Sequence, residues 1–71
     1  MSEATPSPAL LHAVTDSDRA LWESGDSGAI ARRNHAVLAA LSGGWSEQDV
    51  AQAVGVRPQD VARWAGAAVA G

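Results

Sequence analysis

The stretch Glu47–Trp64, EQDVAQAVGVRPQDVARW, holds two short runs with an apolar residue every three or four positions, joined at Gly55. This spacing places the apolar side chains on one face of a helix. Glycine suits the left-handed backbone of a tight turn, and Pro58 suits a first helical turn, where its missing N–H would have no helical partner. The stretch therefore predicts two short helices joined by a tight turn.

The apolar residues of this stretch also predict how the two helices pack. Val50 and Val54 are expected to fill the space between the helices, and Ala51 is small where the second helix crosses the first. Val61 and Trp64 are expected to face back toward the preceding helix. Because these positions agree with one packing arrangement, the stretch predicts a compact helical pair.

The segment before it, ARRNHAVLAALSGGWS (31–46), extends the pattern by one more helix. Ser27 is expected to cap this helix at its start, and Gly43-Gly44 to end it. Ser46 with Asp49 three residues later resembles a capping box for the next helix. One stripe of the helix is apolar and is expected to face the core: Ile30, Val37, Leu38 and Leu41.

The N-terminal part is expected to be a separate acidic helical segment, residues 8–28, after a disordered stretch 1–7. Pro8 suits a first turn, and the residues Thr15–Asp18 are rich in helix-capping types, which favours a second short helix starting there. A continuous helix over 8–24 is the alternative. We favour two helices because a continuous one would place Asp18 on the apolar face.

Composition predicts the fold class and indicates the cell compartment. Seventy-one residues form one small domain, and 16 Ala with no run of alternating β-branched residues predict an all-α fold. There is no Cys, hence no disulfide or thiolate metal site. No signal peptide or membrane span is expected, so the chain is predicted to be cytoplasmic. The apolar, glycine-containing tail 65–71 is expected to fray.

The stretch Glu47–Trp64 resembles the helix-turn-helix of bacterial DNA-binding proteins. With the preceding helix it forms a trihelical unit over about 29–66, similar to the homeodomain-like or repressor-like units of resolvases, transposases, sigma-factor regions and small actinobacterial or phage regulators. The segment 55–66, GVRPQDVARWAG, also resembles the recognition turn of MerR-type regulators. We prefer the homeodomain-like or repressor-like comparison because no basic wing follows.

The resemblance implies a recognition helix at about 58–66 that enters the major groove of duplex DNA. By position, it implies four base-reading residues: Arg57, Gln59, Asp60 and Arg63. Arg pairs with guanine O6 and N7, Gln with adenine, and Asp with cytosine N4. Phosphate contacts are expected from Arg32, Arg33, Ser46 and Gln48. The chain is thus expected to be a sequence-specific transcriptional regulator.

Charge distribution suggests an alternative function. Residues 1–28 carry five acidic side chains and one Arg, whereas residues 29–71 carry four Arg and three acidic side chains, and the net charge is −3. So few cations favour a DNA-binding dimer, or a protein-interaction module that binds a basic sigma factor, polymerase subunit or toxin. The N-terminal apolar residues are expected either to complete the core or to form the dimer or partner surface: Leu10, Leu11, Val14, Leu21 and Trp22.

No enzymatic site is expected. His12 and His35 are single histidines that form no multi-ligand motif, and the serines occur where caps and turns are expected. We therefore expect no catalytic residue, no metal, no cofactor and no small-molecule ligand.

Overall fold

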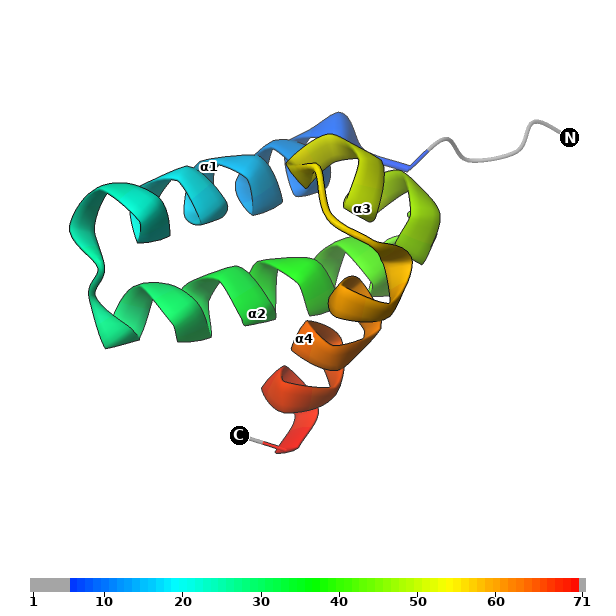
Figure 1. Cartoon of the computed structure of the whole chain (residues 1–71). Coiled ribbons are helices and arrows are strands. Elements are labelled where there is room, and N and C mark those ends of the chain that lie inside the picture. Colours follow the sequence, from blue (N-terminus) through cyan, green and yellow to red (C-terminus); the bar gives the residue numbers. More distant parts are fainter. Residues whose placement is uncertain (1–5, 71) are drawn as a thin grey trace, which may run out of the picture.

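The computed structural model describes residues 6–70, which form four α-helices and contain no strand. The helices are α1 (Pro8–Ser24), α2 (Ser27–Ser42), α3 (Glu47–Val54) and α4 (Pro58–Ala70). Figure 1 shows α1 and α2 running antiparallel, α3 beside the first turns of α1, and α4 crossing α2 steeply. The expected all-α class is confirmed. Within the described part of the chain, no helix has the length and apolarity needed to cross a membrane.

The core is built from one valine of each helix. Val14, Val37, Val50 and Val61 are all 0% exposed and come from α1, α2, α3 and α4 in turn. Alanines separate them and allow the helices to approach closely. Larger apolar side chains cover this centre from outside: Leu10, Leu11, Leu38, Leu41, Trp45, Val54, Val56 and Trp64. The N-terminal helix is therefore part of the same core as the other three.

The preferred prediction of two short helices in residues 8–24 is wrong, because α1 is continuous from Pro8 to Ser24. The Thr15 hydroxyl donates to the carbonyl of His12 at 3.0 Å, so this side chain bonds back within the helix and does not start a new one. Asp18 does lie on the inward side, as the continuous helix required. Its carboxylate is paired there with Arg33, which removes the objection to this alternative.

The caps of the later helices follow their sequence signals closely. The Ser46 hydroxyl accepts from the Asp49 N–H at 3.0 Å at the start of α3, and Gly55 ends α3 with φ +76°. At the start of α2 the capping residue is Asp26, one residue before the predicted Ser27, and its carboxylate accepts from the Gly28 N–H at 3.1 Å.

Two further predictions differ from the structure. Ile30 was expected on the inner stripe of α2, but it is 45% exposed, because the residues opposite it in α4 are the small Ala67 and Ala68. The C-terminal tail, predicted to fray, continues as helix to Ala70, and Ala68 is buried against the rest of the domain.

The segment just before α1 is attached to the turn between α2 and α3. The Trp45 indole N–H donates to the carbonyl of Ser7 at 2.9 Å, and the Ser7 hydroxyl accepts from the Ala9 N–H. Most of the stretch predicted to be disordered, residues 1–7, lies outside the described residues. Ser7 itself caps α1.

Candidate nucleic-acid interface

The turn between α3 and α4 fixes how the last helix leaves the domain. Gly55 is left-handed, and its N–H and that of Val56 both donate to the carbonyl of Ala51, at 2.8 and 3.0 Å. Two N–H groups on one carbonyl close the end of α3 tightly. Val56 then packs against the core, so α4 begins at a defined angle to α3.

The first turn of α4 is closed by a reciprocal pair of hydrogen bonds. The Asp60 N–H donates to the Arg57 carbonyl at 3.0 Å, and the Asp60 carboxylate accepts from the Arg57 N–H at 3.4 Å. The Asp60 side chain thus supplies one half of a capping box, the bond back to the N-cap N–H, while the other bond is a backbone turn because Arg57 has no side-chain acceptor. Pro58 lies inside it, where no N–H is needed.

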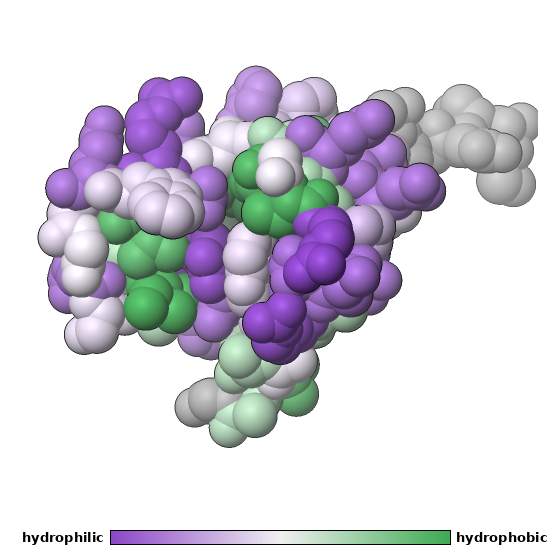
Figure 2. Space-filling view, in the orientation of Figure 1, coloured by the Kyte–Doolittle hydropathy of each residue, from purple (hydrophilic) through white to green (hydrophobic). Residues whose placement is uncertain are grey.

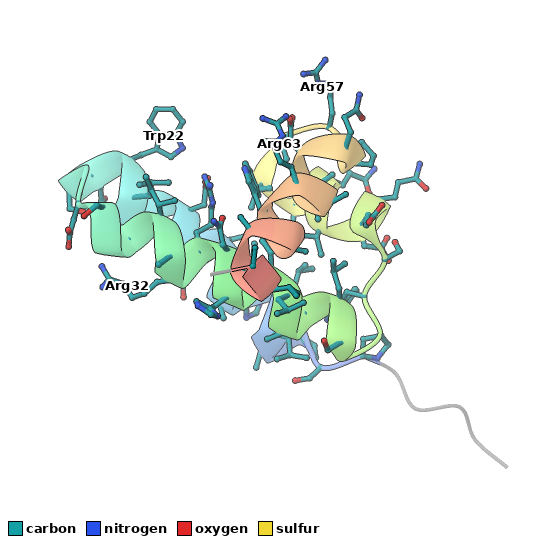
Figure 3. The ribbon with its side chains drawn as sticks, turned by 90° about the horizontal axis from the view of Figure 1, so that it is seen from below. Trp22, Arg32, Arg57 and Arg63 are labelled. Carbon is teal, nitrogen blue, oxygen red and sulfur yellow. The ribbon has the colours of Figure 1, made fainter. Side chains whose placement is uncertain are left out.

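Three of the four predicted base-reading residues form one ionic cluster at this turn. The Arg57 Nε lies 3.6 Å from Asp60 Oδ2, and the Arg63 guanidinium donates to Asp60 Oδ1. The two arginine side chains are 73% and 70% exposed, whereas Asp60 is only 19% exposed. Figure 3 shows Arg57 and Arg63 projecting to the same side of the molecule. We call these three residues the outer cluster.

The remaining α3 and α4 candidates lie at exposed positions. Gln59 is exposed in the first turn of α4, and Gln48 is exposed in the first turn of α3. The Ser46 hydroxyl is already engaged as the cap of α3. Glu47 and Asp49 are exposed in that same first turn, so the region carries acid as well as arginine.

Arg33 occupies a different position from the one predicted for a phosphate contact. Its side chain is 12% exposed, and its Nη1 lies 3.9 Å from the carboxylate of Asp18, which is 18% exposed. Its Nε and Nη2 donate to the Asn34 side-chain carbonyl at 3.3 and 3.1 Å. The guanidinium carbon lies 3.8 Å from the centre of the Trp64 ring. We call Asp18, Arg33, Asn34 and Trp64 the inner cluster.

The inner cluster joins α1, α2 and α4, and it leaves the Arg33 guanidinium little capacity for an outside ligand. Burial lowers the pKa of Arg33, and the negative charge of Asp18 opposes this shift. Since an arginine pKa starts far above neutrality, the group remains a cation. Its positive charge interacts with Asp18 of α1 and with the Trp64 ring of α4.

Arg32 is exposed but stands apart from the outer cluster. It pairs with Asp26 across 3.8 Å, and the two side chains are 64% and 58% exposed. Figure 3 shows Arg32 at the opposite end of the molecule from Arg57, projecting to another side. The structure thus brings together Arg57, Asp60 and Arg63, whereas Arg32 lies apart from them and Arg33 is engaged in the inner cluster.

The predicted N-terminal partner surface is divided by the fold. Val14 is fully buried, and Leu10 and Leu11 pack against the core, while Leu21 is half-buried. Trp22 alone among them is largely exposed, at 82%. In Figure 3 it projects to the same side as Arg57 and Arg63.

Sequence reasoning missed the inner cluster as a unit. The signal for it was present in the helical spacing of residues 14, 18 and 21, which requires an inward aspartate and hence a cationic partner. Nothing in the sequence specified which arginine would supply that charge, because the partner lies on another helix.

In residues 6–70 no three His, Asp or Glu side chains come together as a metal site would require. No family model, curated protein or solved structure matches this chain.

Proposed function

We propose that this chain binds duplex DNA, with the N-terminal half of α4 in the major groove. The observation that carries the proposal is the pair of exposed guanidiniums, Arg57 and Arg63, on one side of a helix that a Gly55 turn joins to α3. Gln59 is exposed in the first turn of the same helix. Arginine and glutamine are the side chains that read guanine and adenine edges in that groove.

The charge of the chain limits the affinity of one copy. Two exposed arginines neutralise few phosphates, and the net charge is −3, so little counterion release is available. Binding by one copy is therefore weak and strongly reduced by salt. A regulator of this kind acts as a dimer on two half-sites, or together with a larger partner.

A ¹H–¹⁵N NMR titration with a short mixed-sequence duplex at low salt tests the proposal. The amide shifts are expected to concentrate at residues 57–63 and to fade at about 150 mM salt, where the Debye length is about 8 Å. Arg57→Ala and Gln59→Ala should weaken binding without altering the fold. Arg32→Ala is the matched control, because it removes an equally exposed arginine from another side of the molecule.

The same titration also shows when the proposal fails. An absence of shifts at residues 57–63 would exclude α4 as the interface. Equal losses of affinity from Arg32→Ala and Arg57→Ala would indicate attraction by net charge, without a defined binding face.

Trp22 supports a second candidate function, a module that binds a basic protein partner. It is 82% exposed at the end of α1, and Glu23 and Asp26 follow it at exposed positions. Figure 2 shows hydrophobic surface between the C-terminal part of α1 and the N-terminal part of α2, and Ile30 of α2 is 45% exposed. An exposed tryptophan with an acidic surround suits an amphipathic, arginine-rich segment.

Fluorescence distinguishes this candidate from DNA binding. The emission should shift to the blue when an arginine-rich amphipathic peptide is added at about 150 mM salt, and Trp22→Leu should abolish the shift. The DNA-binding proposal makes no use of Trp22, so any change in emission caused by a duplex should persist in Trp22→Leu. A peptide response that persists in Trp22→Leu would remove this surface from consideration.

A further inference from the structure

We infer that Asp60 is a positioning residue that sets the sequence selectivity of α4 and does not itself read a base. The inference rests on the proposed DNA binding and changes the role expected for Asp60 as a reader of cytosine. It follows from which atoms of the carboxylate are already engaged within the protein.

Both carboxylate oxygens of Asp60 have partners inside the outer cluster. Oδ1 accepts from Arg63, while Oδ2 accepts from the Arg57 N–H and faces the Arg57 Nε. The carboxylate is 19% exposed, between two arginines exposed by 70% or more. A cytosine N4 would have to pass between both exposed guanidiniums to reach this carboxylate, which is itself little exposed.

Holding the arginines changes what they can bind. A free arginine on a surface reaches any nearby phosphate, and such contacts carry no sequence information. A guanidinium held by a carboxylate keeps fewer rotamers, so less freedom is lost when it meets a base edge at one position. The held geometry therefore favours guanine at fixed places over phosphate anywhere.

The same carboxylate reduces affinity for DNA in general. Its negative charge lies between the two cations that face the duplex, so it repels phosphates and lessens counterion release. Asp60 thus lowers the affinity for DNA in general and raises the selectivity between DNA sequences. This accounts for an aspartate at the centre of the proposed interface of a protein that carries few cations.

Asp60→Asn is the decisive variant. Asparagine keeps the size of the side chain and an oxygen that can cap the Arg57 N–H, and it removes the charge that holds the guanidiniums. Asp49→Asn is the matched control, because Asp49 is an exposed aspartate in the first turn of α3 and makes no ion pair with a described arginine.

Two measurements are made on the full chain. Affinity is measured on a mixed-sequence duplex at about 50 mM salt, and selectivity by sequencing duplexes enriched from a randomised library. Asp60→Asn should bind the mixed duplex about fivefold more tightly, from one repulsive charge, and should enrich a weaker guanine-containing motif. Asp49→Asn should gain less affinity and keep the full motif.

A third measurement needs no DNA. The ¹⁵N resonances of the Arg57 and Arg63 guanidiniums should shift and show faster bond rotation in Asp60→Asn, and should stay unchanged in Asp49→Asn. Unchanged guanidinium resonances in Asp60→Asn would overturn the inference, because Asp60 would then not hold the two arginine side chains in solution.

The outcomes separate this inference from the proposed function. If Asp60→Asn and Asp49→Asn gain equal affinity and keep equal selectivity, Asp60 acts only through net charge, and the positioning role is overturned while DNA binding stands. If Asp60→Asn loses affinity for the mixed duplex, Asp60 does not repel the duplex, and the inference is overturned. If neither the unaltered chain nor the variants bind any duplex, the DNA-binding proposal fails and the selectivity role fails with it.

Discussion

The inner and outer clusters use the same residue types, arginine and aspartate, in opposite settings. In the inner cluster Asp18 of α1 meets Arg33 of α2 under the Trp64 ring of α4, and both charged side chains are less than a fifth exposed. In the outer cluster Arg57 directly precedes α4 and Asp60 and Arg63 lie in its first two turns, and the two arginines are exposed to solvent. One cluster ties three helices together, and the other lies on the surface of a helix already in place.

The difference shows that burial decides the role of an arginine–carboxylate pair. A buried pair serves the fold, and an exposed pair remains available to a ligand. Taking a charge out of water is costly, so a half-buried arginine is retained only with a carboxylate, a hydrogen-bond acceptor and a ring to receive it. Among the described residues no buried side-chain polar atom is left without a hydrogen-bond partner. An exposed pair is worth little to folding, which leaves its charges available to a ligand.

Arg33→Ala tests the inner cluster most severely. The change removes the partner of a half-buried carboxylate and a stacked cation, and it opens space beside Trp64. We expect the free energy of unfolding to fall by about 3 kcal/mol, most of the stability of a domain this small. Urea denaturation followed by circular dichroism at 222 nm measures it.

Arg32→Ala is the control for that result, because it deletes the neighbouring arginine of the same helix, which is 64% exposed. Its effect should stay within about 0.5 kcal/mol. Equal losses from the two substitutions would mean that burial does not distinguish the two arginines.

Asp18→Asn tests the same cluster from the other helix. The amide retains the shape of the side chain but leaves Arg33 without its counter-charge, so we expect a loss of about 2 kcal/mol. The loss should persist in about 0.5 M NaCl, because a half-buried pair is screened less than an exposed one. Asp16→Asn, two residues earlier on the exposed side of α1, should change stability little in the same denaturation.

Trp64→Leu tests the ring that lies over Arg33 and packs against the core. Leucine keeps an apolar side chain against the core but removes the π-face, so stability should fall by about 1 kcal/mol or somewhat more. Trp22→Leu should cost less than about 0.5 kcal/mol, since Trp22 touches little of the domain. A larger loss of stability at Trp22 than at Trp64 would mean that Trp22, and not Trp64, is packed into the domain.

The fold was largely predictable because its signals are local. Ser46, Gly55 and Pro58 each indicate a helix boundary through their own backbone chemistry. The spacing of Val50, Val54 and Val61 indicates which face of each helix is buried. Such signals need no knowledge of distant residues.

The errors arose where a distant residue decides the outcome. A continuous α1 places Asp18 on the apolar face, which argues against that helix until the partner of Asp18, Arg33 on another helix, is known. Ile30 was expected inside because its periodicity is correct, but the side chains opposite it are alanines, which leave it half uncovered. The same reason explains the error in the candidate interface. Sequence position alone could not show that Arg33 is largely buried and Arg57 is exposed.

Arg63→Ala has the smallest expected effect on stability and tests whether the outer cluster is free to bind DNA. Its ion pair with Asp60 is exposed on the arginine side, so the free energy of unfolding should change by no more than about 0.5 kcal/mol. Affinity for a mixed-sequence duplex should nevertheless fall, and the slope of log affinity against log salt should decrease by about 1 if this arginine meets a phosphate. A smaller change in slope with a loss of guanine preference would instead indicate base contact. If Arg63→Ala destabilised the domain as much as Arg33→Ala, the outer cluster too would be structural, and α4 would have no cation free for DNA.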